Sequence, residues 1–330
     1  MSSSISRIVV TRRLPSVLLS KLSNRPNTKL IYHDSDDPLP YDKLLEYVQQ
    51  DGGASALLCL LSDKIDKSLI QASQGNLKVI ATMSVGVSHI DLDYVKQNQI
   101  KIGYTPNVLT DSTADLVLAL TLSVARRLPE AANAVRTGEW NTWKPFWMTG
   151  KDIGTSTIGI IGMGRIGEAI TKRFKGFGCK NILYTGRSGA KPAIDQELGT
   201  TYCDMPTLLK SSDIIITICA LTNETKGLIN YEALHLMKSD AIFINASRGE
   251  VVNQNDLIKI LQERPNFRVG LDVTTPEPLP LDSPLLTLKN CLILPHIGSA
   301  SEGCRMKMAE MTIDNIINGL DNTPMPAEYK

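Results

Sequence analysis

Short apolar runs alternate with longer amphipathic stretches along the whole chain. The apolar runs of the first half are residues 7–14, 29–33, 55–61, 77–83 and 101–106. Those of the second half are residues 157–162, 181–185, 213–219, 241–246, 267–273 and 291–295. Runs of this length, separated by helical periodicity, are typical of parallel strands buried between helices. We therefore expect an α/β protein with two parallel sheets, the first built from the five earlier runs and the second from the six later ones.

Two longer helical patterns, over residues 110–128 and 299–320, predict where the chain passes from one sheet to the other. Each begins with a pattern that resembles a capping box: Ser112-x-x-Asp115 in the first and Ser299-x-x-Glu302 in the second. The second pattern follows the last strand, so we expect it to return to the first sheet. A chain of 330 residues is long enough for two cores. The predicted domains are residues 1–107 with 299–330, and residues 108–298.

Composition excludes several classes of function. The chain carries 35 Lys and Arg against 34 Asp and Glu, so it has no basic surplus for nucleic acid or an anionic membrane. No apolar run approaches the length of a membrane span. The six cysteines never have a CxxC spacing, which favours free thiols in a reducing compartment. We expect a cytoplasmic protein; a mitochondrial presequence in the first residues, MSSSISR, is the alternative.

A glycine-rich turn follows the apolar run at residues 157–162. Its glycines, Gly162, Gly164 and Gly167, have the spacing GxGxxG. In a dinucleotide fold the first permits a tight turn, the second lets a pyrophosphate approach the backbone, and the third lets helix and strand pack closely. The start of the helix, at Arg165 and Ile166, favours an anion. The pattern predicts a Rossmann-type domain that binds a dinucleotide, and a turn without a ligand is the alternative.

Arg187 stands about twenty residues beyond this loop, where a chain that binds NAD would carry an acid. An acid there accepts a hydrogen bond from the ribose 2′-hydroxyl of NAD, whereas an arginine can pair with the 2′-phosphate of NADP. We predict that Arg187, with Ser188, makes NADPH the preferred cofactor and NADH a weaker substitute. The alternative is a solvated arginine in a surface turn.

Three of the later strands lead into ionisable residues. Arg248 follows one strand, Asp272 and Glu277 follow the next, and His296 follows the last. Because the carboxyl ends of parallel strands meet at one edge of a sheet, we expect Arg248, Glu277 and His296 to converge. Each residue also has a purely structural interpretation. Arg248 would stabilise a strand end, Glu277 would be a solvated acid in a loop, and His296 would be a structural histidine. The four histidines have no spacing that indicates a metal site.

Taken in order, these motifs resemble those of the D-isomer-specific 2-hydroxyacid dehydrogenase family. The family pattern has a glycine loop, an Asn-x-x-Arg-Gly segment, an aspartate, a glutamate beside proline, and a late Pro-His pair. Here the last four are Asn245–Gly249, Asp272, Glu277-Pro278 and Pro295-His296. The segments VTRRLP, GYTPNVLTDSTA, SRGEVVNQ and LDVTTPEPLP are similar to the subgroup that reduces glyoxylate and hydroxypyruvate. The resemblance implies a flavodoxin-like substrate domain and a Rossmann NAD(P)-binding domain.

The resemblance further implies hydride transfer from NADPH to a small 2-keto acid, taking hydroxypyruvate to D-glycerate and glyoxylate to glycolate. His296 would donate the proton, a role that suits imidazole because it titrates near neutral pH. Glu277 would orient this imidazole and favour its protonated form. Arg248 would hold the carboxylate of the substrate and polarise its carbonyl group. No metal is needed for this chemistry.

Further site residues are implied by the same resemblance. The backbone amides of Val85 and Gly86 would bind the substrate carboxylate, and Leu61 would form a wall of the substrate pocket. A simple turn and a core leucine are the alternatives. Asp272 would contribute to the substrate site and fix the nicotinamide amide. The remaining cofactor contacts would come from the backbone at Ala220, Ala246 and Gly298.

All three tryptophans of the chain fall within residues 139–147. Such a cluster is either a core plug or an anchor at an interface. The resemblance implies a homodimer through the region after residues 110–128, with Trp143 reaching the substrate pocket of the partner.

Two other readings of the sequence stay open. Another D-2-hydroxyacid dehydrogenase, of the phosphoglycerate or D-lactate type, would share Arg248, Glu277 and His296. A corepressor-like protein of the same fold would bind the dinucleotide as a signal and catalyse nothing.

Overall fold

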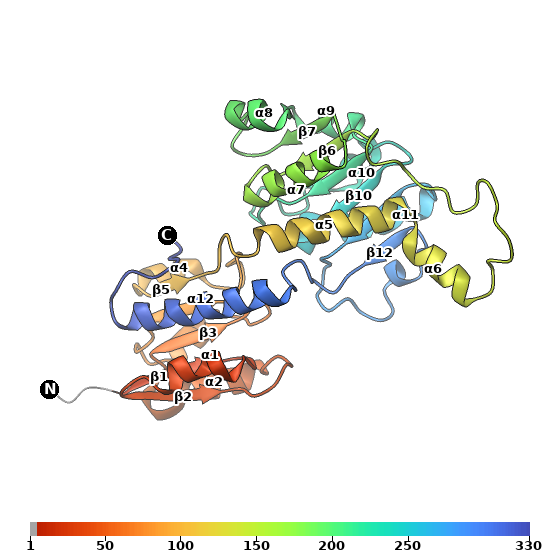
Figure 1. The fold of residues 1–330 in the computed structure, drawn as a ribbon. Helices are drawn as coiled ribbons and strands as arrows, with labels where there is room; N and C mark the ends of the chain where they lie inside the picture. Colours follow the sequence, from red (N-terminus) through yellow and green to blue (C-terminus); the bar gives the residue numbers. More distant parts are fainter. Residues whose placement is uncertain (1–4) are drawn as a thin grey trace. The chain divides into compact units, whose positions relative to one another are not determined.

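The computed structural model describes residues 5–330, which divide into two compact units (Figure 1). One unit contains residues up to 109 and those from 301 to the C-terminus, and the other contains residues 110–300. The C-terminal helix α12 (Glu302–Leu320) therefore packs with the N-terminal unit, as the sequence pattern predicts. The first part of the MSSSISR stretch, residues 1–4, lies outside the described residues.

The first unit is built on a parallel sheet with the strand order β2-β1-β3-β4-β5. This is the order of a flavodoxin-like sheet. The strands are β1 (Ser6–Val10), β2 (Thr28–Tyr32), β3 (Ala56–Cys59), β4 (Val79–Thr82) and β5 (Lys101–Gly103). The helices other than α12 are α1 (Ser16–Ser23), α2 (Tyr41–Gln49), α3 (Lys67–Ala72) and α4 (Leu92–Gln97), with a short 3₁₀ helix η1 (Gln50–Gly52).

Successive residues of these strands face opposite sides of the sheet and fill two apolar clusters. On β1, Ile8 and Val10 pack with residues of α1 and α12, whereas Val9 packs with residues of α2, α3 and α4. All three side chains are fully buried. Helices on both faces leave no solvated side for the central strands, which explains why their sequences are apolar throughout.

The second unit is built on a parallel sheet with the strand order β12-β11-β10-β9-β6-β7-β8. Counted from β6, this is the 3-2-1-4-5-6 order of a Rossmann sheet with one further strand. The strands are β6 (Ile158–Ile161), β7 (Ile182–Thr185), β8 (Thr201–Tyr202), β9 (Ile214–Thr217), β10 (Ile242–Asn245), β11 (Arg268–Leu271) and β12 (Cys291–Ile293). The prediction of two doubly wound parallel sheets is confirmed.

Helices cover both faces of this second sheet. Helices α5 and α7 lie side by side on one face, and α9, α10 and α11 pack on the other. The helices are α5 (Thr110–Ala125), α6 (Leu128–Arg136), α7 (Arg165–Gly176), α8 (Pro192–Leu198), α9 (Met205–Ser211), α10 (Tyr231–Leu236) and α11 (Gln254–Glu263), with 3₁₀ helices η2 (Gly249–Val251) and η3 (Pro284–Leu286). None of the helices among residues 5–330 is long and apolar enough to cross a membrane.

Two details of the sequence analysis are wrong. The second sheet has a seventh strand, β8, which the pattern missed because its two residues are exposed and form no apolar run. Neither predicted capping box exists. Ser112 lies inside the first turn of α5 and donates a hydrogen bond to the carbonyl of Gly298, while α12 begins only after Ser301, whose side chain caps nothing.

The helix predicted over residues 110–128 is also interrupted. Arg127 adopts a left-handed conformation with a φ of 55°, which ends α5 and starts α6 in a new direction. Its guanidinium donates to Glu130 at 2.6 Å, and Arg268 donates to the other oxygen of Glu130 at 2.6 Å. These ion pairs anchor α6 on the start of β11.

Candidate active site

The glycine loop has the geometry that its sequence requires. Gly162 follows β6 with a φ of +112°, and a Cβ there would lie 2.8 Å from the backbone nitrogen of Cys219. A Cβ on Gly167 would lie 2.3 Å from the carbonyl oxygen of Gly162, so only glycine lets α7 pack this closely on the turn. At Gly164, directly before α7, a Cβ would meet nothing within 4 Å. This open space fits the close approach of a pyrophosphate to the backbone.

A pocket of about 500 Å³ opens beside this loop, within the second unit. Its volume is in the range of sites that bind small molecules. Its walls come from the glycine loop, the turn after β7 and the segment after β9. Of the predicted cofactor residues, those that line the pocket are Gly162, Gly164, Arg187, Ser188 and Ala220. The glycine geometry and the pocket together fit a dinucleotide.

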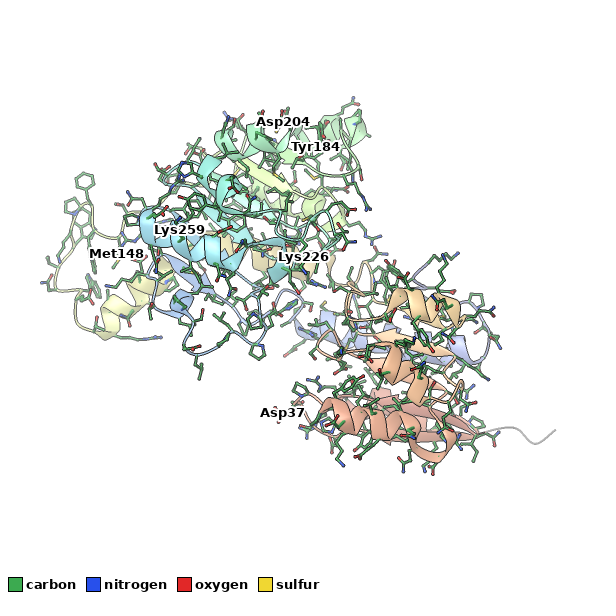
Figure 2. All side chains as sticks on the ribbon, turned by 180° about the vertical axis from the view of Figure 1, so that it is seen from behind. Asp37, Met148, Tyr184, Asp204, Lys226 and Lys259 are labelled. Carbon is green, nitrogen blue, oxygen red and sulfur yellow. The ribbon has the colours of Figure 1, made fainter. Side chains whose placement is uncertain are left out.

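The turn after β7 presents Arg187 and Ser188 to the pocket with both residues exposed. The hydroxyl of the buried Tyr184, labelled in Figure 2, accepts a hydrogen bond from the backbone of Lys191 at 2.6 Å and donates to Asp195 at 3.3 Å. The turn is therefore held at both ends. No aspartate or glutamate occupies residues 185–191, where an acid would accept a bond from a 2′-hydroxyl.

Two further charged residues line this pocket. Lys191 donates from its Nζ to the carbonyl of Met163 at 2.5 Å and to Glu168 at 3.1 Å. Glu224 stands in the segment after β9, and its pKa is lowered by a hydrogen bond with the side chain of Thr222 and, to a lesser extent, by the charge of Arg187. The pocket is thus lined by two cations, Arg187 and Lys191, and by one acid, Glu224, whose pKa the charge of Arg187 helps to lower.

His296 and Glu277 form a hydrogen-bonded pair. The Nδ1 atom of His296 lies 2.8 Å from Oε2 of Glu277, and the two side chains are 24% and 30% exposed. The other oxygen of Glu277 accepts the backbone N–H of Thr274 at 3.0 Å. Burial alone would raise the pKa of Glu277, but the hydrogen bond and charge of His296 outweigh it and lower the pKa. An ionised carboxylate accepts Nδ1–H, which leaves Nε2 as the ring nitrogen free of this pair.

The turn that carries Arg248 is shaped by the buried Asn245 at the end of β10. Its side-chain oxygen accepts the backbone N–H of Ser247 at 3.1 Å, and its amide donates to the carbonyl of Arg248 at 3.0 Å. Burial lowers the pKa of Arg248, while the charges of Glu277 and Glu250 raise it. A half-buried guanidinium within the field of a carboxylate is a candidate for binding an anion.

Asp272 holds the turn on which His296 stands. Its carboxylate accepts the backbone N–H groups of Ile297 at 2.8 Å and Gly298 at 2.9 Å. Its own carbonyl accepts the N–H of His296 at 2.9 Å. His296 adopts a φ of 53°, so this turn depends on such bonds. Burial raises the pKa of Asp272, and the bonds from Ile297 and Gly298 oppose that rise.

Comparison with known proteins decides the family. Residues 118–298 match the family model of the D-isomer specific 2-hydroxyacid dehydrogenase, NAD binding domain. The chain is 47% identical to human glyoxylate reductase/hydroxypyruvate reductase over 99% of its own length and 98% of that protein. The chain belongs to the D-isomer-specific 2-hydroxyacid dehydrogenase family. It is thus an oxidoreductase of the 2-hydroxyacid dehydrogenase type with a nicotinamide dinucleotide as its cofactor.

Further comparisons agree with this assignment. Glyoxylate reductase from Thermococcus litoralis is 42% identical over 94% of this chain and 92% of its own. A crystal structure of a protein from Thermus thermophilus has a TM-score of 0.90 at 39% identity, covering 98% of this chain and 100% of that one. An NADPH-dependent glyoxylate/hydroxypyruvate reductase from Sinorhizobium meliloti, solved with NADP and malonate, has a TM-score of 0.85 at 27% identity, covering 99% of this chain and 97% of its own.

The other residues predicted for the cofactor are not among those that line the pocket beside the glycine loop. Arg165, Ile166 and Gly167 form the first turn of α7. Ala246 follows β10, and Gly298 lies two residues after His296; neither lines the pocket. Their predicted cofactor contacts, and that of Asp272, stay predictions.

Three of the residues predicted for the substrate site, Val85, Gly86 and Leu61, belong to the first unit. Val85 and Gly86 follow β4, and the carbonyl of Gly86 accepts a hydrogen bond from the hydroxyl of Ser84 at 2.7 Å. Leu61 follows β3 and is 38% exposed, which is unlike a core leucine. Their predicted roles are not tested by these contacts.

The pocket is also lined by residues that were not predicted from the sequence, among them Lys191, Thr222, Glu224 and Thr225. Thr225 donates to the carbonyl of Ala220 at 2.7 Å and accepts the backbone N–H of Thr222 at 2.7 Å, which closes the turn after β9. The position of these residues could have indicated them, because the turns at the carboxyl ends of β7 and β9 flank the glycine loop in any sheet of this order. The types of the missed residues form no known motif.

Proposed function

We propose that this dehydrogenase uses NADPH to reduce hydroxypyruvate to D-glycerate and glyoxylate to glycolate. The observation that carries the proposal is the hydrogen bond between His296 and Glu277, in the same unit as a dinucleotide pocket lined by Arg187. The human relative named for both substrates and the NADPH-dependent reductase from Sinorhizobium meliloti support it. The second unit serves as the dinucleotide-binding domain and the first as the substrate-binding domain.

The reduction needs a proton for the carbonyl oxygen and a cation for the carboxylate of the substrate. The bound NADPH supplies the hydride. His296 donates the proton from Nε2, because Nδ1 is held by Glu277. The carboxylate of Glu277 stabilises the imidazolium before the transfer and fixes the ring orientation. Arg248 pairs with the substrate carboxylate, for which a half-buried guanidinium is suited.

The preference for NADPH rests on the turn after β7. Arg187 and Ser188 are exposed to the pocket, and the acid that would accept a hydrogen bond from the 2′-hydroxyl of NAD is missing. An arginine can pair with a 2′-phosphate through two hydrogen bonds, and Ser188 can donate one more. Lys191 adds a second cation to the same pocket.

The function is tested by following oxidation of NADPH and NADH at 340 nm with four 2-keto acids. We expect turnover with hydroxypyruvate and glyoxylate, and higher kcat/KM with NADPH than with NADH. Preference for pyruvate would indicate a D-lactate dehydrogenase, and preference for phosphohydroxypyruvate a phosphoglycerate dehydrogenase. Absence of turnover with all four acids would refute the proposal and favour a dinucleotide-sensing protein.

The segment after α6 supports a homodimer. Residues 137–150 extend away from the sheet of the second unit, as the position of Met148 in Figure 2 also shows. Trp140, Trp143 and Phe146 are 60%, 80% and 88% exposed on this arm, and Val135 on α6 is 58% exposed. Exposed aromatic side chains at this density are typical of an interface anchor. We infer that a second copy of the chain covers the arm and that Trp143 contacts the partner.

We expect the double variant Trp143→Ser/Phe146→Ser to weaken the dimer at least about thirtyfold, because loss of a central aromatic anchor typically costs about 2 kcal/mol or more. Sedimentation equilibrium measures the dissociation constant. Val17→Ser, which removes another exposed apolar side chain from α1 of the first unit, serves as the control and leaves the dimer unchanged. A wild-type chain that sediments as a monomer would refute the inference.

A further inference from the structure

We propose that Gln254 is a positioning residue for the proton donor: its side-chain amide holds the turn at residues 274–277 so that Glu277 stays in contact with His296. This inference rests on the proposed function, because it assigns Gln254 a part in the same reaction. Gln254 is the first residue of α11 and is half-buried.

The amide of Gln254 binds both backbone groups of a single residue. Its Oε1 accepts the N–H of Thr275 at 3.0 Å, and its Nε2 donates to the carbonyl of Thr275 at 2.6 Å. Two bonds from one planar group fix both the position and the orientation of the bonded peptide units. The amide does not cap its own helix, since the side chain of Asn253 accepts the N–H of Asp256 at the start of α11.

The turn held in this way carries Glu277. The hydroxyl of Thr274 donates to the carbonyl of Pro276 at 3.0 Å, and the N–H of Thr274 donates to Oε1 of Glu277 at 3.0 Å. The second oxygen of Glu277 is the one that contacts His296. Any displacement of the turn therefore moves Glu277 relative to the imidazole.

His296 is anchored by different bonds. Its backbone N–H donates to the carbonyl of Asp272, and the Asp272 carboxylate holds the two residues that follow. The turn that carries His296 is thus held by Asp272, whereas the turn that carries Glu277 is held by Gln254 of α11. The backbone beside Arg248 packs closely on the same turn, because a Cβ on Gly249 would lie 1.9 Å from the carbonyl oxygen of Thr274.

Gln254 carries no charge, so replacing it cannot change the proton affinity of His296 through a direct charge effect. The ionisable groups around the pair are Arg248 after β10 and Asp272 at the end of β11, with Glu250 of η2 acting on Arg248. Replacing Gln254 with methionine alters none of these charges and keeps a similar side-chain volume. A change in the proton affinity of the imidazole would therefore report lost contact with Glu277.

The test compares the full-length wild type with Gln254→Met, Glu277→Gln and Asn253→Ala. We measure kcat, KM and the pH dependence of kcat/KM with hydroxypyruvate and NADPH. We expect Gln254→Met to lower kcat about tenfold. We also expect the pH at which kcat/KM falls on the alkaline side to decrease by up to about one unit, as in Glu277→Gln, because the proton donor loses the carboxylate that favours its protonated form. KM for NADPH stays within about twofold, because the pocket beside the glycine loop is untouched.

Asn253→Ala is the matched structural control, because it removes the cap of the same helix without touching Thr275. It lowers the melting temperature and leaves the pH profile as in the wild type. Equal changes in both variants, or a wild-type profile in Gln254→Met, would overturn the proposal.

A second measurement needs no turnover. NMR of histidine-labelled protein follows the titration of the His296 ring, and its midpoint is expected to move to lower pH in Gln254→Met. If the wild type reduces no 2-keto acid but this midpoint moves, the proposed function fails and the positioning contact stands. If the wild type is active and the midpoint is unchanged, only the role of Gln254 fails.

Discussion

We expect the His296→Ala variant to reduce hydroxypyruvate about 10²–10⁴ times more slowly than the wild type while it binds NADPH as tightly. The variant removes the imidazole that donates the proton to the carbonyl oxygen. It leaves the glycine loop and Arg187 in place, because His296 lines no part of the pocket beside them. Single-turnover absorbance at 340 nm measures the chemical step, and a fluorescence titration measures NADPH binding.

His235→Ala is the matched control for this variant. His235 belongs to α10 of the same unit, where its ring stacks on Tyr231 and lies 2.9 Å from Arg264. The His235→Ala variant loses a histidine but keeps the proposed proton donor, so we expect it to turn over hydroxypyruvate like the wild type. Turnover retained in His296→Ala would show that another group donates the proton. Loss of NADPH binding would instead show that His296 supports the structure of the unit.

Much of the fold follows from local pattern. Strands such as β9 and β10 consist of buried apolar residues flanked by helices, so hydrophobicity alone marks them. Failures occurred where tertiary contacts decide the local structure. The predicted helix breaks at Arg127, whose partner Glu130 is also bound by Arg268, 138 residues further along the chain, and no local pattern encodes this long-range contact. The same holds for Ser112, whose hydroxyl bonds to Gly298 across the chain instead of capping α5.

The site divides in the same way. Strand ends and family motifs predict His296, Glu277 and Arg248, and the structure places His296 and Glu277 in direct contact. Gln254 and Lys191 were not predicted as site residues, because a sequence does not show that Gln254 bonds to a turn 21 residues away or that Lys191 bonds to a carbonyl 28 residues away. These contacts are visible only in the fold.

We expect the Arg187→Ala variant to lose about 10- to 100-fold in the ratio of kcat/KM for NADPH to that for NADH. A hydrogen bond between charged groups contributes about 1.5–3 kcal/mol, and only NADPH carries the phosphate that makes it. KM for NADPH should rise while kcat stays nearly constant, because the contact is equally strong before and during hydride transfer. Steady-state kinetics with both cofactors at saturating hydroxypyruvate measures the ratio.

The charge of the pocket sharpens this test. Glu224→Gln removes the acid that shares the pocket with Arg187, so we expect it to change the ratio in the opposite direction, toward NADPH. Arg126→Ala, at an exposed arginine after α5 that lines no part of the pocket, controls for loss of positive charge and leaves the ratio unchanged. A ratio unaltered by Arg187→Ala would mean that the arginine is solvated and that the phosphate is bound elsewhere. Opposite shifts in Arg187→Ala and Glu224→Gln would place the 2′-phosphate between these two side chains, because only a negative group near both responds to each charge with the opposite sign.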